Sequence, residues 1–452
     1  MADPTTDMTA EPEPSIATAP VAPAEPPAEP PASPPDVDLG RRRFFRQFAG
    51  ELANTAATMV GTVQAIQRTS AELAGTILDP SRAAELATAA TPLPPAVTTE
   101  VVQFRTSFRV DGQSIRFVDQ RALPGEVIEH ASISAAEVCW AIRNEVVVGA
   151  PAIGQAAAVG LGLTADRVRT AKPYARRATL RGAANALVNT APTLASIRWA
   201  VDRVIAAYET VGELSEDGAA IVDAMNAEAE RIIGEVTAEH GRLVDVGVMA
   251  LDALARPETG PLRILIHGPS GALAGGQLGT ALSIAIAAHH AERDVQVIVP
   301  EARPNFGGAR ISCWELAAAG VPHTLVADAA AAALVATGEV DVVIVPADRV
   351  VANGDTAATI GSYALAVVAR RRGIPFYVCA PTSSLDAATE RGVSITIGSR
   401  PASELQRFAG VELAPPGTQA SVPTHDVTPA ELVTGFITPE GVRSALFASP
   451  LG

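Results

Sequence analysis

The chain has 452 residues, of which 48% are hydrophobic but only 4% aromatic, and its formal net charge at pH 7 is -15. Such a charge disfavours nucleic acid as a partner, because the phosphate backbone would be repelled. The three cysteines, Cys139, Cys313 and Cys379, have neither metal-site nor disulfide-framework spacing. No apolar run approaches the roughly 20 residues that span a bilayer. We therefore expect a cytoplasmic protein without a transmembrane segment, metal or other cofactor.

The first hundred residues differ in composition from the rest. Residues 1–40 are rich in Pro, Ala and Glu and are predicted to form a disordered tail. Apolar residues at helical spacing then predict an amphipathic helix over 41–78, followed by a linker over 79–99. The helix could pack on the chain's own body, or dock a protein partner or an anionic surface. Arg42-Arg43-Phe44-Phe45 resembles a twin-arginine export signal, but the leader is long and acidic, and Glu51 interrupts the apolar region.

The next part, residues 100–255, is predicted to be a hairpin followed by a helical N-terminal domain. Val101–Val110 and Ile115–Asp119 read as two strands separated by an Asp-Gly turn. From Ser134 to about Leu254 nearly everything has helical periodicity, and Ser134-Ala-Ala-Glu137 is a capping-box start.

Residues 256–452 alternate between short apolar strands and helices, which predicts a Rossmann-like, doubly wound parallel sheet. The fold class expected for the chain is therefore α/β. The tail of this domain is predicted to add one helix near Thr428-Pro429. The expected strands are Leu262–Ile266, Val295–Val299, Thr324–Ala327, Val342–Val345 and Pro375–Cys379, and the expected helices are Leu278–His290, Ala309–Ala319, Ala329–Ala336 and Thr356–Arg372.

The strand Val342–Val345 leads directly to a candidate functional carboxylate. Pro346 ends the strand, and Asp348 follows it. Ligands of open α/β sheets bind beyond the carboxyl ends of the strands, so an acid or base is expected at Asp348. A helix cap or turn residue is the alternative interpretation. Asn353-Gly354-Asp355 is predicted to be a turn that opens the helix Thr356–Arg372.

A glycine-rich stretch, Gly268–Thr280, follows the first strand of the sheet and opens a helix. Glycines there let the backbone approach a ligand, and the helix start favours an anion. The stretch has neither a Walker nor a dinucleotide-binding pattern. A tight strand-to-helix turn that only packs closely is the alternative.

A series of motifs follows in a recognisable order along the chain: Asp119-Gln-Arg121-Ala-Leu-Pro124, Gly149-Ala-Pro-Ala-Ile-Gly154, Gly271-Ala-Leu-Ala274, Gly279-Thr-Ala-Leu282, Glu301-Ala-Arg-Pro304, Gly308-Ala-Arg310, Trp314-Glu-Leu316, Ala347-Asp-Arg349, Asn353-Gly-Asp355, Pro375-Phe-Tyr-Val378 and Asp426-Val-Thr-Pro429. This series resembles the methylthioribose-1-phosphate isomerase family, which also holds ribose-1,5-bisphosphate isomerases and the regulatory subunits of translation initiation factor 2B. The resemblance covers about residues 101–445. It implies a helical N-terminal domain, a Rossmann-like C-terminal domain, a sugar-phosphate cleft between them and a homodimer.

The sequence departs from the family pattern at the positions that carry its chemistry. The resemblance implies a cysteine where this chain has Gly268, while the acid/base aspartate is retained as Asp348. Cations and amides of the family pattern are also replaced, at Val148, Ala191, Gly307, Ala358 and Thr359. Lost cations weaken phosphate binding, so the cleft is expected to take a less anionic ligand, or none.

Two functions remain open from the sequence. One is a divergent aldose–ketose isomerase of a pentose or pentose phosphate, with Asp348 as acid/base. The other is a catalytically silent sugar- or nucleotide-binding or scaffold protein. His267 is a second catalytic candidate, although a structural role is the alternative; Cys379 is a candidate thiolate or a packed hydrophobe; His425 is expected to line the cleft. The predicted substrate-binding residues are Gly149, Ala150, Ser270, Gly271, Gly308, Asn353, Gly354 and Asp355.

Overall fold

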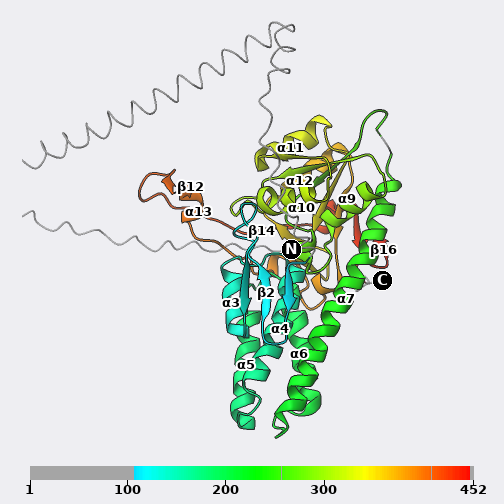
Figure 1. The fold of residues 1–452 in the computed structure, drawn as a ribbon. Helices are drawn as coiled ribbons and strands as arrows, with labels where there is room; N and C mark the ends of the chain where they lie inside the picture. The colour runs from blue at the N-terminus through cyan, green and yellow to red at the C-terminus, as the bar shows by residue number, and fades with distance from the viewer. Residues whose placement is uncertain (1–105, 256, 409, 448–452) are drawn as a thin grey trace, which may run out of the picture. The chain divides into compact units, whose positions relative to one another are not determined.

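The computed structural model describes residues 106–255, 257–408 and 410–447 (Figure 1). All of them belong to one compact unit that begins at Thr99. The tail, amphipathic helix and linker predicted for residues 1–99 lie outside the described residues, as do residues 101–105 of the predicted hairpin. Those predictions, and the division of the folded part at residue 255, therefore stay predictions.

A small antiparallel sheet precedes the helices. Strand β1 (Phe108–Val110) pairs with β2 (Ile115–Val118) around a turn at Asp111, as the sequence indicates. A third strand, β3 (Glu129–Ser132), pairs with the other edge of β2 and was not predicted. Its sequence, Glu-His-Ala-Ser, lacks the alternation of apolar and polar residues by which a strand is recognised.

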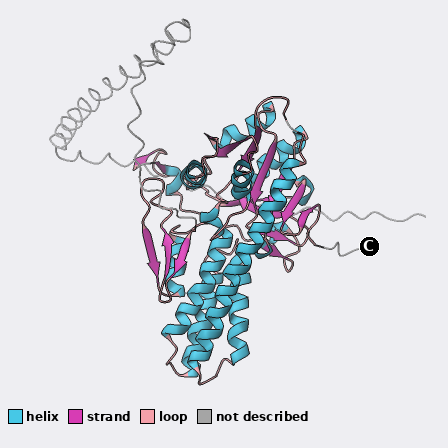
Figure 2. Cartoon of the chain, turned by 45° about the vertical axis from the view of Figure 1, so that its right-hand side comes forward, coloured by secondary structure: helices cyan, strands magenta, loops and turns pink. Residues whose placement is uncertain are grey.

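Five helices follow, and they pack around a core of Ala, Val, Leu and Ile side chains. Ser134 caps the first of them, as predicted: its side chain accepts a hydrogen bond from the N–H of Glu137, and the Glu137 carboxylate accepts one from the N–H of Ile133. The almost wholly buried α4 packs against α6 and α7 (Figures 1 and 2). The helices are α3 (Ala135–Arg143), α4 (Ala150–Arg167), α5 (Pro173–Val188), α6 (Ala195–Val211) and α7 (Gly218–Asp252).

The 35-residue helix α7 joins the two parts of the folded unit. Side chains of its first half, from Ile221 to Val236, belong to the core of the helical part. Leu243, Val244 and Leu251 of its second half pack on the sheet that follows. None of the described helices, this long one included, is apolar enough over a sufficient length to cross a membrane.

The larger part is built on a seven-stranded sheet in the order β16-β15-β10-β7-β4-β5-β6. All neighbouring strands are parallel except β16, which pairs antiparallel with β15. The prediction of a parallel sheet is therefore confirmed. The strands are β4 (Leu262–Ile266), β5 (Val295–Pro300), β6 (His323–Val326), β7 (Val342–Pro346), β10 (Phe376–Cys379), β15 (Gly435–Thr438) and β16 (Gly441–Arg443).

Helices cover both faces of this sheet, because alternate strand residues point to opposite sides. Ile264 and Ile266 face α7, α9 (Ala281–His290) and α10 (Cys313–Ala318), whereas Leu265 faces α11 (Asp328–Thr337) and α12 (Ser362–Arg372). The chain runs from β4 outward through β5 and β6 and then returns to the other side of β4 to form β7. The strand order thus reverses between β4 and β7, and their carboxyl ends flank the place where such sheets bind ligands.

The start of one predicted helix, Thr356–Arg372, is wrong, and so is the whole of the helix predicted near Thr428-Pro429. Residues 356–359 are not helical: β8 (Arg349–Val351) and β9 (Thr356–Thr359) form a hairpin around Asn353-Gly354-Asp355, and the helix begins only at Ser362. β9 also pairs with β14 (His425–Thr428), so hydrogen bonds on both edges override the helix propensity of its alanines. Near Thr428-Pro429 there is a single 3₁₀ turn, Ala430–Leu432, instead of a helix.

Candidate functional site

A cleft of about 340 Å³ lies where the two parts of the folded unit meet. The sheet contributes Pro269, just after β4, together with Pro346 and Asp348 at the end of β7. The helical part contributes Gly149 and Ala150 at the start of α4, and the loop from Thr190 to Leu194 before α6. The cleft therefore lies at the point where the strand order reverses, as expected for a ligand site.

Asp348 is held in the cleft by its backbone. Its N–H donates to the Ala357 carbonyl at 3.0 Å, and its carbonyl accepts from the N–H of Ala195, the first residue of α6, at 3.1 Å. The neighbouring Arg349 donates to the carbonyls of Pro192 and Thr193 and forms an ion pair with Asp386. These bonds fix the cleft loop before α6 to the sheet. None of them uses the Asp348 carboxylate, which can therefore contact other groups.

Within the part of the chain that the structure describes, the Asp348 carboxylate has one close partner, His425, which begins β14 (His425–Thr428). The two are 3.1 Å apart from Nε2 to Oδ2, and both side chains are about 15% exposed, at 16% for His425 and 14% for Asp348. His425 lines the cleft, as the sequence indicates. The hydroxyl of Thr424 lies 2.7 Å from the other ring nitrogen, Nδ1. The imidazole is thus placed by polar contacts on both sides.

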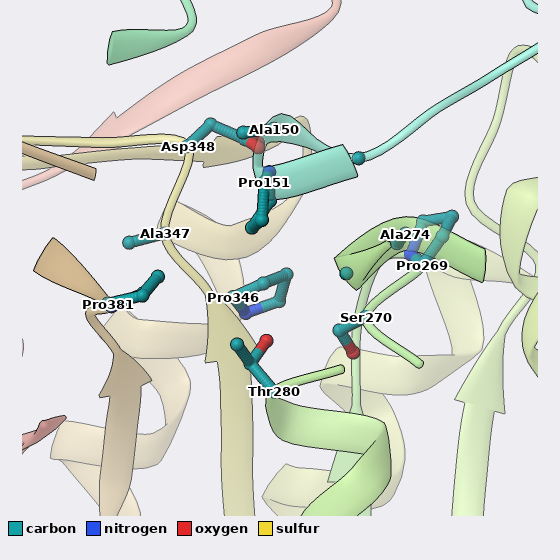
Figure 3. A pocket seen from close by; sticks show the side chains of 12 residues that line it. Ala150, Pro151, Pro269, Ser270, Ala274, Thr280, Pro346, Ala347, Asp348 and Pro381 are labelled. Atoms are coloured by element: carbon teal, nitrogen blue, oxygen red, sulfur yellow. The ribbon is translucent and has the colours of Figure 1, made fainter. Parts of the chain in front are cut away.

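A narrow space of about 20 Å³ continues from the cleft past Asp348. Figure 3 shows Ala150 and Pro151 beside Asp348, with Pro346, Ser270 and Thr280 farther along. A space of this volume holds about one water molecule. It is too small for a sugar, so we place any ligand in the larger cleft.

The N-terminus of the 18-residue helix α4 points into the cleft. Gly149 caps it with φ +93°, and a Cβ on Gly149 would lie 2.4 Å from the backbone of Ala274. Glycine is therefore required here by both backbone conformation and close packing. The partial positive charge of a helix N-terminus favours an anion.

A charged cluster forms one rim of the cleft. Arg400 makes ion pairs with Glu145 at 2.7 Å and with Glu404 at 2.5 Å. Burial opposes the charge of Arg400, but the hydrogen bond with Glu404 and the attraction of both carboxylates outweigh it and raise the pKa of Arg400. Asn305 donates to Glu145 at 3.1 Å. Glu145 has φ +55°, an unusual conformation for a residue other than glycine. Arg400 thereby ties the helical part to the sheet part.

Two further arginines line the cleft without a carboxylate partner among the contacts of the described residues. Arg303 donates to the backbone carbonyl of Glu404 at 3.0 Å and lies over the Phe306 ring at 4.6 Å. Arg143 is exposed and has a long contact of 3.4 Å with the Thr190 hydroxyl. Arginines from other positions thus supply cations to the cleft, so the expectation of a less anionic ligand, or none, is not supported.

Gly268, at the position where the family resemblance implies a cysteine, has no room for a side chain. Its φ is +92°, and an added Cβ would lie 2.4 Å from the Oγ1 of Thr359. Thr359 lines the cleft, as do Val148 and Ala191. Three of the positions where the sequence departs from the family pattern are therefore grouped around the same cavity, and the Thr359 side chain fills the space beside Gly268.

We expect Gly268→Ala to lower the free energy of unfolding by about 1–3 kcal/mol more than Gly112→Ala does. Gly112 has a similar φ of +84° but no neighbour within 4 Å of an added Cβ, so it reports backbone strain alone. Removing the obstructing side chain with Thr359→Ala should recover most of the difference. Chemical denaturation of Gly268→Ala, Gly112→Ala, Thr359→Ala and the double variant Gly268→Ala/Thr359→Ala measures this. Equal losses at both glycines would show that Thr359 does not fill the space.

The glycine-rich stretch after β4 is held from two sides by buried titratable groups. Glu315 of α10 accepts from the N–H of Leu273 at 3.0 Å. Burial raises the pKa of Glu315 to about 7, although hydrogen bonds from the backbone of Leu273 and Ala272 lower it. His240 of α7 contacts the carbonyl of Leu278 through Nδ1, and burial lowers its pKa to about 4. These contacts favour the interpretation of the stretch as a closely packed turn.

The two groups predict opposite dependences of stability on pH. The pKa of Glu315 is raised, so its contribution to the free energy of unfolding falls by about 3 kcal/mol as pH rises from about 4.5 to 7. The pKa of His240 is lowered, so its contribution falls by a similar amount as pH drops from about 6.5 to 4. Glu315→Gln should therefore raise stability relative to the parent chain at pH 7.5 but not at pH 4.5.

Denaturation at a series of pH values tests this prediction. The exposed Glu230→Gln serves as a matched control, for which the stability difference from the parent chain should not change with pH. A pH-independent difference for Glu315→Gln would contradict the raised pKa. The complementary variant His240→Gln should lose the fall in stability at low pH and keep the fall toward pH 7 that Glu315 causes.

Several predicted site residues lie away from the cleft surface. His267 is buried, its Nε2 contacts the Ile360 carbonyl at 2.8 Å, and it does not line the cleft. Ser270 accepts from the N–H of Leu282 and lines only the narrow space. A Cβ on Gly271 would meet the Glu315 carboxylate, and one on Gly308 would meet the Pro300 carbonyl, so both glycines serve close packing. Of the predicted substrate-binding residues, Gly149 and Ala150 line the larger cleft.

The Asn353-Gly354-Asp355 turn has a structural role in the contacts that the structure describes. The Asp355 carboxylate accepts from the N–H groups of Gly392 and Ala430 and from the Asn353 side chain. Cys379 is fully buried, and burial raises the pKa of its thiol, so it packs as a small hydrophobe. Within the described ranges, no group of three or more His, Cys, Asp or Glu side chains is arranged to hold a metal ion.

Sequence reasoning did not identify the arginines of the cleft. Arg303 stands inside Glu301-Ala-Arg-Pro304, one of the motifs that resemble the isomerase family, and this position could have marked it as a cleft residue. Arg143 and Arg400 stand in segments whose pattern is that of an ordinary helix end and an irregular loop. Their approach to one cavity depends on the packing of the helical part on the sheet.

Comparison with known proteins gives a consistent family assignment. Residues 146–445 match the model of the initiation factor 2 subunit family. A methylthioribose-1-phosphate isomerase of Chloroflexus aurantiacus is 41% identical over 334 residues, which cover 74% of this chain and 93% of that protein. One from Synechococcus sp. (strain CC9605) is 42% identical over 339 residues, covering 74% and 93%.

Solved structures agree in fold. The 5-methylthioribose 1-phosphate isomerase of Pyrococcus horikoshii OT3 matches with a TM-score of 0.64 and 36% identity, covering 75% of this chain and 92% of that chain. The translation initiation factor eIF-2B, subunit delta, from A. fulgidus matches with a TM-score of 0.61 and 30% identity, covering 75% and 95%.

Proposed function

The chain belongs to the initiation factor 2 subunit family, and from that premise we propose that it is an aldose–ketose isomerase of a pentose 1-phosphate, with Asp348 as an acid/base. The observation that carries the proposal is the Asp348 carboxylate in a cleft of about 340 Å³ at the reversal of the strand order. A cleft of this size suits a small ligand.

The charges in the cleft support an anionic sugar. The cleft is lined by three arginines and by two carboxylates, Glu145 and Asp348, so positive charges outnumber negative ones even when His425 is neutral. Arg303 has hydrogen-bond donors not engaged by a carboxylate, and arginine donors pair well with phosphate oxygens. The N-terminus of α4 adds a second feature that favours an anion. Relatives named methylthioribose-1-phosphate isomerase make that pentose phosphate the first substrate to test.

Isomerisation of a cyclic pentose 1-phosphate leaves the atomic composition of the substrate unchanged. The bond from C1 to the ring oxygen breaks, the ring oxygen takes a proton, a hydride moves from C2 to C1, and the C2 hydroxyl loses its proton. The enzyme must give one proton and take one. A carboxylate within hydrogen-bond reach of a sugar oxygen can serve in either direction, and Asp348 is the cleft residue proposed for this role.

The second candidate is a protein that binds a sugar phosphate or a nucleotide without turnover, or one that acts as a scaffold. Gly268 favours it, because this residue has no side chain to move a proton and Thr359 fills the space beside it. The similarity to the initiation factor subunit from A. fulgidus is compatible with the same role. We also propose that the chain forms a homodimer and that residues 41–78 dock a protein partner.

Two measurements on the purified full chain separate these functions. Turnover of methylthioribose 1-phosphate and of ribose 1-phosphate should be detected as formation of the ketose. Calorimetry with the same sugars and with nucleotides should detect binding. Turnover supports the isomerase. Binding without turnover supports a binding protein whose cleft is not catalytic, and the absence of both supports a scaffold protein.

A further inference from the structure

The imidazole of His425 lies directly beside the Asp348 carboxylate in the cleft. Its Nε2 is 3.1 Å from Oδ2 of Asp348, so an N–H at Nε2 can donate to the carboxylate. His425 is also the register partner of Thr359 in the antiparallel pair of β14 and β9, which places the two side chains on the same face of that sheet. Both line the cleft.

The hydrogen bonds around the ring suit two protonation states. The Thr424 hydroxyl lies 2.7 Å from Nδ1 of His425 and 3.0 Å from the Gly398 carbonyl. When the hydroxyl donates to Gly398, its oxygen can accept from a protonated Nδ1, and the ring is an imidazolium. When the hydroxyl turns to donate to Nδ1, the ring is neutral. The Gly398 carbonyl keeps a partner in either case, because it also accepts from the N–H of Thr424 at 3.0 Å. Rotation of one hydroxyl thus satisfies both states.

Other groups near the cleft lack the position for a second proton carrier. Gly268 has no side chain, His267 is buried against the Ile360 carbonyl, and Cys379 is fully buried. Glu145 is paired with Arg400 on the rim. Among the described residues that line the cleft, His425 is the titratable side chain in contact with Asp348.

We propose that His425 and Asp348 act as a paired acid and base: His425 gives a proton to the ring oxygen as the bond to C1 breaks, and Asp348 takes the proton of the C2 hydroxyl as the hydride moves from C2 to C1. The pair ends with the proton on Asp348, and its return to His425 restores the starting state. This assignment rests on the proposed isomerase function. It also supplies the second proton carrier that Gly268 cannot provide.

The test compares two replacements of His425 in the full chain. His425→Gln keeps a hydrogen-bond donor toward Asp348 but cannot carry a proton, whereas His425→Phe keeps only the ring shape. With methylthioribose 1-phosphate as substrate, both should lose about 10²–10⁴-fold in kcat. Their KM should change by no more than a few-fold, and their melting temperatures should stay close to that of the parent chain. His289→Gln, on α9 away from the cleft lining, is the matched control and should keep full activity.

The outcomes separate the pair from the function. A parent chain that turns over the substrate, with His425→Gln equally active, overturns the paired mechanism and leaves the isomerase in place. If only His425→Phe loses activity, His425 serves to position Asp348 through a hydrogen bond, and the proposal that His425 transfers a proton is overturned. A parent chain that forms no ketose from either sugar phosphate overturns the isomerase and the pair together.

Discussion

Asp348→Asn is expected to lower kcat for methylthioribose 1-phosphate by about 10²–10⁴-fold, the usual contribution of a positioned acid or base. The asparagine can still accept the hydrogen bond from His425, and the backbone bonds to Ala195 and Ala357 do not involve the side chain. The fold and the binding of the sugar phosphate should therefore be nearly unchanged. Steady-state kinetics together with calorimetry on the same preparation measure both quantities.

A matched control is the exposed Asp294, which does not line the cleft. Asp294→Asn removes the same charge from the chain and should keep full activity. Unchanged turnover in Asp348→Asn would rule out the role proposed for this carboxylate. A large loss of binding instead of kcat would show that Asp348 holds the ligand without taking part in proton transfer.

The sheet was predictable because its strands are buried on both faces and read as short apolar runs between turns. Strand β4 has the predicted bounds, Leu262–Ile266, and β7 exceeds its prediction by one residue, Pro346. Strand β9 was misread because Thr356–Thr359 is rich in alanine, and its conformation is decided by pairing with β8 and β14. Local propensity carries no information about such partners.

The candidate site was predictable only where a residue follows directly from a strand end or from a motif. Asp348 was found because it closes β7, and His425 because it is an unusual neighbour of the Asp426-Val-Thr-Pro motif. The sequence held no sign that these two side chains are in contact, since β14 lies beside β9 through a pairing between segments far apart in the chain. His267 was proposed because it stands next to Gly268, where the family resemblance implies a cysteine, but its ring faces the Ile360 carbonyl.

Arg303→Met is expected to weaken binding of a pentose 1-phosphate by about 10- to 100-fold while kcat changes little. A hydrogen bond to a charged group contributes about 1.5–3 kcal/mol, and about 1.4 kcal/mol corresponds to tenfold in affinity. Among the described residues, the Arg303 guanidinium contacts the backbone carbonyl of Glu404 and the Phe306 ring. Methionine keeps the packing on the ring but cannot bind phosphate. Calorimetry at low ionic strength, repeated at higher salt, measures the loss and its electrostatic origin.

Arg400→Met is the comparison variant, because it removes an arginine that already has carboxylate partners. Arg400 lines the same cleft, but its guanidinium is already neutralised by Glu145 and Glu404. Removing it leaves two half-buried carboxylates unpaired, so the free energy of unfolding should fall more than in Arg303→Met. If Arg303→Met binds the sugar phosphate as tightly as the parent chain while Arg143→Met does not, the phosphate lies on the side of α3. If neither variant weakens binding, Arg303 and Arg143 do not hold the phosphate, and the N-terminus of α4 is left as the feature that favours an anion.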